Sequence, residues 1–200
     1  MARPRKFVEA DAERAARDTF HRKGFAGTSL SDLAEATGLG KGSLYNTFGS
    51  KEELYARAFH SYCDDAITNT AQILERSQPG LHGVLAYVER IVEETIEDPA
   101  RPGCMIAKAT SELGSTTPAV RGEAHRTLRT MEDALATHLS QARDNGELRP
   151  DSGDPEDLAT LVLALTRGIE ALGAAGYDAD ALLKIGPVLH QLVAAASKTP

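Results

Sequence analysis

The stretch TSLSDLAEATGLGKGSLYNTF, residues 28–48, decides the fold of the N-terminal part of this chain. Thr28 or Ser29 can cap a first short helix, because both residue types accept hydrogen bonds from free backbone N–H groups. Gly38 follows where a tight turn requires a left-handed backbone. A second short helix is expected over residues 41–47. Two short helices joined by a glycine turn predict a helix-turn-helix.

The two faces of this motif differ in chemistry. Leucines fall on the inward side, and Ala34 is small where two helices must cross closely. The second helix presents a cation and hydrogen-bonding groups on its other side, namely Lys41, Ser43, Tyr45 and Asn46. A major groove is wide enough to admit such a helix and offers donors and acceptors on the base edges. The pattern therefore predicts a DNA-recognition helix.

Helical periodicity dominates the whole chain, and no strand-like alternation interrupts it. Caps, glycines and prolines divide it into nine expected helices, over residues 7–23, 30–36, 41–47, 51–77, 81–97, 104–113, 118–145, 155–175 and 181–196. Gly186 and Pro187 are expected to kink or interrupt the last of these helices. The expected fold class is therefore all-α.

Composition and charge agree with a DNA-binding protein that touches DNA at one end. The 200 residues are 42% hydrophobic, which suffices for a core. The net charge of -7 is uneven: residues 1–55 carry nine Lys and Arg against eight Asp and Glu, and residues 56–200 carry thirteen against twenty-one. We expect neither a signal peptide nor a membrane-spanning segment, and we expect the protein in the cytoplasm.

Four motifs at matching spacing carry a family resemblance. They are FHRKGF at residues 20–25, TSLSDLA at 28–34, GLGKGSLY at 38–45 and FGSKEEL at 48–54. Together they resemble the DNA-binding head of the TetR family of regulators over residues 7–58. Beyond this range only length and helix count fit. The resemblance implies a dimeric repressor that a ligand releases from DNA, with a DNA-binding domain over residues 1–50 and a ligand-binding and dimerisation domain over residues 51–200.

Two departures from the family pattern affect the recognition helix. Gly40 stands where the family often has Ser or Thr as the helix cap, and Gly is an acceptable substitute. Asn46 and Thr47 replace a commoner aromatic or basic residue followed by His. The operator sequence of a relative therefore does not transfer to this chain.

The predicted DNA contacts combine the recognition helix with hydroxyls and cations around it. Lys51 begins the fourth helix, where its ammonium and the helix N-terminus can both face a phosphate. Arg3 and Arg5 form an arm that can reach a neighbouring phosphate or the minor groove. The full predicted set is Arg3, Arg5, Thr28, Ser29, Lys41, Gly42, Ser43, Tyr45, Asn46, Thr47 and Lys51.

The body is predicted to form a homodimer and to hold an effector. The expected helices over residues 155–175 and 181–196 are apolar around more than one face, which predicts pairing across a two-fold axis. A largely apolar effector is expected in a cavity among the fourth to eighth helices. Its candidate contacts are Phe59, Tyr62, Cys63, Tyr87, Cys104, Met105, Lys108, Met131, His138 and Arg167. The six histidines show no ligand spacing, so no metal or cofactor is expected.

Three alternatives remain open at this point. Cys104 follows Arg101 and opens a helix, an environment that favours a thiolate, so oxidation or alkylation of Cys104 is a second possible switch. A DNA-binding protein without a ligand is another. A small helical enzyme or binding protein without DNA activity is the third, but no nucleophile–base or carboxylate constellation supports the enzyme.

Overall fold

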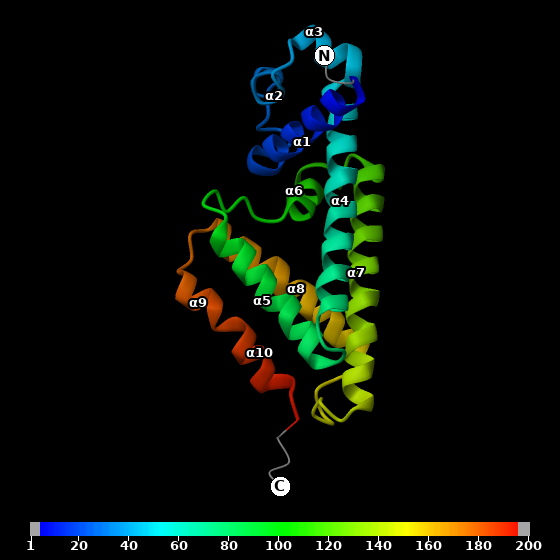
Figure 1. The fold of residues 1–200 in the computed structure, drawn as a ribbon, viewed down its shortest axis with the longest axis vertical. Coiled ribbons are helices and arrows are strands. Elements are labelled where there is room, and N and C mark those ends of the chain that lie inside the picture. The colour runs from blue at the N-terminus through cyan, green and yellow to red at the C-terminus, as the bar shows by residue number, and fades with distance from the viewer. Residues whose placement is uncertain (1–4, 196–200) are drawn as a thin grey trace. The chain divides into compact units, whose positions relative to one another are not determined.

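The computed structural model describes residues 5–195, and side chains from residue 9 onward. Within this range the chain forms ten α-helices and no β-strand (Figure 1). They are α1 (Arg5–Lys23), α2 (Leu30–Thr37), α3 (Lys41–Phe48), α4 (Lys51–Arg76), α5 (Leu81–Glu97), α6 (Met105–Leu113), α7 (Pro118–Asp144), α8 (Pro155–Ala174), α9 (Ala179–Leu183) and α10 (Ile185–Val193). The expected all-α class is confirmed.

The last expected helix is interrupted, as Gly186 and Pro187 predicted. α9 and α10 are its two halves, with Lys184 between them. Proline excludes the carbonyl of the residue four positions earlier from a helical hydrogen bond, here that of Leu183. The break therefore falls just before the turn that contains Pro187.

The described residues pack into two compact units. Unit 1 comprises residues up to 65 together with 104–125, and unit 2 comprises residues 66–103 together with 126 onward. The long helices α4 and α7 each contribute residues to both units. The boundary after residue 50, between a DNA-binding domain and a ligand-binding and dimerisation domain, remains a prediction. It divides the chain by function, whereas the two units are defined by packing.

The core of unit 1 contains an aromatic cluster. The rings of Phe20 and Phe25 each meet Tyr55 edge to face, with centroids 5.0 Å apart in both pairs. Tyr55 and Phe59, one helical turn apart on α4, stack at 6.0 Å. Burial raises the pKa of Tyr55 well above its usual range, and the charge of Glu112 adds to the effect. These rings join the end of α1 to α4 and so position the first turns of α4.

The core of unit 2 is mostly aliphatic. α5 packs along α8, and α9 and α10 pack on α5. Its largest fully buried side chains include Tyr87, Leu135, Leu139 and Ile169. Burial also raises the pKa of the Tyr87 phenol. Among the described residues, none of the helices has the length and apolarity needed to cross a membrane.

Candidate functional site

The two faces of α3 are separated as the sequence predicted. Leu44 and Phe48, one turn apart, are buried. The opposite side carries Lys41, Gly42, Ser43 and Asn46, all exposed, and Tyr45 with half its surface exposed. Thr47 is half-buried. The helix therefore presents a hydrogen-bonding surface to solvent while two apolar residues anchor it.

Local signals fix the helix that precedes α3. Ser29 and Asp32 form a reciprocal capping box at the start of α2, and Gly38 ends that helix in the left-handed region at φ 67°. The Asp32 carboxylate also accepts a hydrogen bond from Lys23 Nζ at 2.6 Å. The Lys23 ammonium, followed by the Ser29 hydroxyl and N–H, holds the pKa of Asp32 well below its usual range. At the start of α3, Gly40 provides no side-chain cap.

Thr28 differs from the expectation for a phosphate contact. Its side chain is only 1% exposed, and its hydroxyl donates to the Gly24 carbonyl at 2.6 Å. The residue therefore holds the α1–α2 turn together from inside. Ser29 is exposed, although its hydroxyl already bonds to Asp32. Arg3 lies outside the described residues, as does the side chain of Arg5, which begins α1.

Lys51 lies at the N-terminus of α4 and contacts an aromatic ring. Its Nζ sits 4.3 Å from the centroid of Phe25. Such a cation–π contact orients the ammonium without neutralising it. A helix N-terminus and an oriented cation together favour an anion such as a DNA phosphate.

Two side chains of α6 form hydrogen bonds with the backbone at the end of α1 and in the turn after it. Lys108 Nζ donates to the carbonyls of His21 at 2.8 Å and Arg22 at 3.4 Å, so it caps the C-terminus of α1. Glu112, one turn later, accepts from the backbone N–H of Phe25 at 2.6 Å. Burial lowers the pKa of Lys108. Lys108 was expected in an effector pocket, and the structure instead places its ammonium on the backbone of α1.

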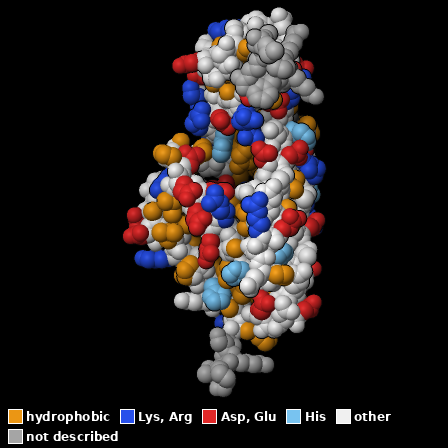
Figure 2. Space-filling view, viewed as in Figure 1, with side chains coloured by type: hydrophobic (Ala, Val, Ile, Leu, Met, Phe, Trp, Pro, Cys, Tyr) orange, Lys and Arg blue, Asp and Glu red, His pale blue; other side chains and the backbone are white. Residues whose placement is uncertain are grey.

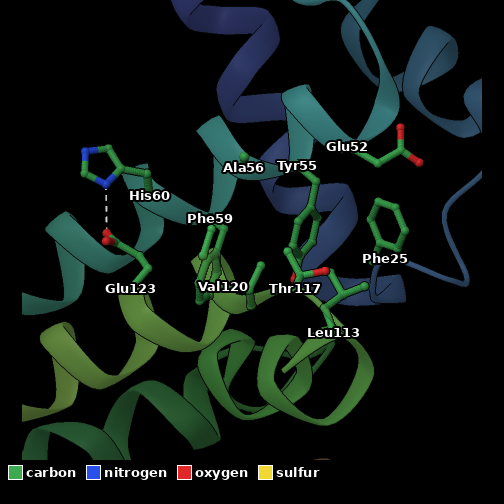
Figure 3. A pocket seen from close by; sticks show the side chains of 11 residues that line it. Phe25, Glu52, Tyr55, Ala56, Phe59, His60, Leu113, Thr117, Val120 and Glu123 are labelled. Atoms are coloured by element: carbon green, nitrogen blue, oxygen red, sulfur yellow. Dashed lines mark hydrogen bonds and ion pairs between the residues drawn. The ribbon is translucent and has the colours of Figure 1, made fainter. Parts of the chain in front are cut away.

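Unit 1 contains a cavity of about 290 Å³, and Phe25, whose N–H donates to Glu112, is part of its lining (Figure 3). Its walls are mostly apolar, and aromatic rings of the α1–α2 turn and α4 face residues of α7 and the end of α6. The lining comprises Phe25, Glu52, Tyr55, Ala56, Phe59, His60, Leu113, Thr117, Ala119, Val120 and Glu123. Of the ten predicted effector contacts, Phe59 is the one that lines it. A volume near 300 Å³ is at the lower end for small-molecule pockets.

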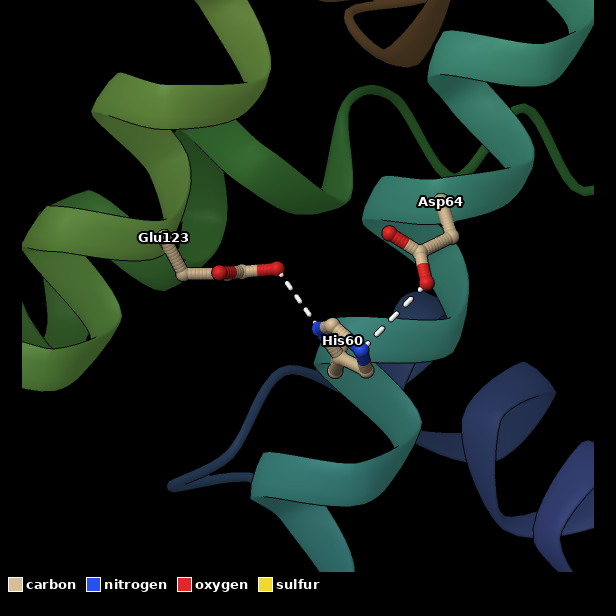
Figure 4. A group of neighbouring side chains, drawn as sticks. All are labelled: His60, Asp64 and Glu123. Carbon is tan, nitrogen blue, oxygen red and sulfur yellow. Dashed lines mark hydrogen bonds and ion pairs between the residues drawn. The ribbon is translucent and has the colours of Figure 1, made fainter.

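His60 sits at the edge of this cavity between two carboxylates (Figure 4). Its Nδ1 lies 2.8 Å from Glu123 Oε1 on α7, and its Nε2 lies 3.3 Å from Asp64 Oδ2 on α4. The three side chains offer possible ligand atoms within 4.8 Å of one another. Because each ring nitrogen faces its own carboxylate, the three side chains form a polar network that joins α4 to α7. Sequence reasoning missed it, although the four-residue spacing of His60 and Asp64 was a visible signal.

The other predicted effector contacts divide between the two units. Unit 1 contains Tyr62, Cys63, Cys104 and Met105. Tyr62 packs edge to face on His21, and Cys63 and Met105 are core residues. Unit 2 contains Tyr87, Met131, His138 and Arg167. There Arg167 lies 3.5 Å from the Tyr87 hydroxyl and 3.0 Å from Glu170, while Met131 is buried and His138 packs against Gly83.

The thiol considered as an alternative switch is buried. Cys104 occupies the N-cap position of α6 with 5% of its surface exposed. Neither it nor Cys63 forms a disulfide. Arg101, expected to assist the thiolate, donates to the Tyr177 carbonyl in unit 2.

Large apolar side chains are exposed on the last three helices of unit 2. They are Leu161 on α8, Leu183 on α9, and Val188 and Leu192 on α10, each at least 50% exposed. In the space-filling view, hydrophobic side chains gather at the left edge of the surface, where Figure 1 places α9 (Figure 2). Such a concentration is unusual on a surface that faces only water.

Comparisons with known proteins match both halves of the chain. Residues 14–58 match the family model described as bacterial regulatory proteins, tetR family. Residues 80–183 match the model described as tetracyclin repressor-like, C-terminal domain. The HTH-type transcriptional regulator YezE of Bacillus subtilis is 32% identical over 172 residues, which is 84% of each chain. The HTH-type transcriptional repressor BdcR of Escherichia coli is 30% identical over 104 residues, 52% of this chain and 53% of its own.

Solved structures agree. A TetR transcriptional regulator from Chloroflexus aurantiacus superposes with a TM-score of 0.81 at 26% identity, covering 96% of this chain and 98% of its own. The regulator CifR, as a cysteine mutant in complex with a 26-base-pair operator, shares the fold with a TM-score of 0.76 at 24% identity, covering 96% of this chain and 100% of its own. With both family models and the YezE relative in agreement, the chain belongs to the TetR family of bacterial transcriptional regulators.

Proposed function

We propose that this DNA-binding regulator is a repressor that binds a near-palindromic operator as a homodimer and leaves it when a small molecule binds. The observation that carries the proposal is the outward polar face of α3 beside Lys51 at the start of α4. α3 supplies the groups that read base edges, and Lys51 supplies a phosphate contact. We expect a protein with this role in the cytoplasm, with the DNA.

Selection from random-sequence duplexes, followed by anisotropy titration of the selected duplex, tests the DNA-binding part. Replacing Lys41 or Asn46 by Ala should cost about 1–3 kcal/mol of binding and relax base preference at one position. Lys51→Ala should weaken binding to all DNA sequences alike. It should also reduce the number of counterions released on binding, measured from the salt dependence of affinity, by about one.

Arg76→Ala is the matched control, because it removes one positive charge from an exposed position in the last turn of α4, outside α3 and outside the apolar surface of α8, α9 and α10. Its affinity should equal that of the wild type. If Lys41→Ala binds the selected duplex as tightly as the control does, α3 is not the recognition helix.

A second copy of this chain is the proposed occupant of the exposed apolar surface on α8, α9 and α10. Two such surfaces related by a two-fold axis would bury Leu161, Val188 and Leu192 against each other. A dimer places two α3 helices on half-sites about 34 Å apart, or slightly more. Light scattering at micromolar concentration should give the dimer mass for the wild type. Val188→Glu combined with Leu192→Glu should give the monomer, and a wild-type monomer would contradict the proposal.

The regulator YezE and the repressor BdcR support a regulatory role, and the name of BdcR supports repression. A ligand shifts the protein off DNA only by its preference for the released state. The predicted effector contacts in the two units remain proposals for where such a ligand binds. Loss of operator binding on addition of a candidate compound, measured at constant salt, is the direct test of release.

A further inference from the structure

The cavity beside the α1–α2 turn combines aromatic walls with acidic edges. Phe25, Tyr55 and Phe59 contribute rings to it, and Glu52 and Glu123 contribute carboxylates (Figure 3). Its lining residues include no Lys or Arg. Aromatic faces attract cations through the ring quadrupole, and a nearby carboxylate adds to that attraction.

The two carboxylates lie at different parts of the cavity. Figure 3 shows Glu52 beside the Phe25 ring and Glu123 near His60. His60 Nδ1 holds the Glu123 oxygen at 2.8 Å, so this carboxylate has a fixed position on α7. Burial keeps the Tyr55 phenol neutral, so it adds no charge. The edges of the cavity therefore carry two carboxylates and the His60 imidazole, while its centre is apolar.

We propose that this cavity binds an apolar, ring-containing or branched molecule that carries one basic nitrogen. The apolar part would fill the space between α4 and α7, and the ammonium would lie at an edge beside Glu52 or Glu123. A volume of about 290 Å³ lies at the lower end for small-molecule pockets, so the ligand is small. Phenylalkylamines of about ten non-hydrogen atoms are of the right size.

Phe25 connects this cavity to the DNA contact. The same ring lines the cavity and lies under the Lys51 ammonium at 4.3 Å. Its backbone N–H is held by Glu112 on α6. A ligand that packs against Phe25 and turns the ring removes the contact that orients Lys51. The link from ligand binding to weaker operator binding rests on the proposed function.

Calorimetry on the full chain without DNA tests the chemical class with three probes of matched size. 4-Phenylbutylamine, 4-phenylbutanol and 5-phenylpentanoate share the phenylbutyl group and differ in the charge of the terminal group. The amine should bind about tenfold more tightly than the alcohol, and the carboxylate most weakly. Glu52→Gln or Glu123→Gln should remove the preference for the amine. Glu75→Gln, an exposed position on α4 outside the lining, should keep it.

A second variant tests the location. Ala56 lines the cavity but is exposed, so Ala56→Phe fills the space without disturbing the core. It should abolish binding of all three probes. The proposal is overturned if no probe binds, if the alcohol or carboxylate binds as tightly as the amine, if both Gln variants keep the preference, or if Ala56→Phe still binds. Operator affinity is measured separately, so failure of release would refute only the link to DNA binding.

Discussion

The contact of Glu112 on α6 with the α1–α2 turn predicts that two alanine substitutions at similar glycines lower the free energy of unfolding by different amounts. Gly24 and Gly38 each follow a helix in the left-handed region, at φ 73° and 67°. A Cβ added at Gly38 meets nothing within 4 Å, whereas a Cβ at Gly24 would collide with the Glu112 carboxylate. Gly38→Ala therefore measures backbone strain alone, and Gly24→Ala measures strain plus displacement of Glu112.

The magnitudes follow from these two contributions. A left-handed backbone costs an L-residue about 1–2 kcal/mol, which applies to both substitutions. Gly24→Ala also separates Glu112 from the Phe25 N–H, a charge-assisted bond of 2.6 Å. Bonds of this type contribute about 1.5–3 kcal/mol when buried. Because Glu112 is exposed, we expect an excess of about 1 kcal/mol for Gly24→Ala over Gly38→Ala.

Urea unfolding followed by circular dichroism, at one fixed protein concentration, measures both costs. Glu112→Ala completes the cycle, because without the carboxylate the added Cβ at Gly24 has room. In that background the cost of Gly24→Ala should fall to that of Gly38→Ala, which gives a coupling energy of about 1 kcal/mol. The reasoning is refuted if the two single substitutions cost the same, or if the excess persists in the Glu112→Ala background.

Three further predictions concern the recognition helix, its support and the thiol. Gly42→Ala should stabilise the protein by up to about 1 kcal/mol, since the added Cβ meets nothing within 4 Å. The same variant should bind operator more weakly if the backbone at Gly42 approaches DNA closely. Unchanged affinity would exclude that approach. Asp32 has a lowered pKa in the folded state, so its contribution to stability is present above its unfolded pKa of about 3.9 and is lost as pH falls below it. The difference in urea midpoint between wild type and Asp32→Asn should therefore be larger at pH 7 than at pH 3, and a constant difference would contradict the assignment. Burial of Cys104 restricts access of oxidants, so mild peroxide should have the same effect on operator binding by wild type and by Cys104→Ser; a loss of binding confined to the wild type would favour the redox switch.

The sequence alone determined the features that depend on neighbours within a few residues. The capping box of Ser29 and Asp32, the left-handed Gly38 and the break before Pro187 all arise from local hydrogen bonds and steric limits. The inward direction of Leu44 follows from helical period in the same way. The recognition helix could therefore be predicted together with its two faces.

Only the tertiary structure decided which side chains meet across long separations. The bond from Phe25 to Glu112 spans 87 residues, and that from His60 to Glu123 spans 63. No periodicity specifies such partners, because they depend on how helices pack. Packing also buried the side chain of Thr28, although its hydroxyl donates to the carbonyl of Gly24, only four residues earlier. For the same reason most predicted effector contacts are core residues, while the cavity in unit 1 is lined by residues of the α1–α2 turn, α4 and α7.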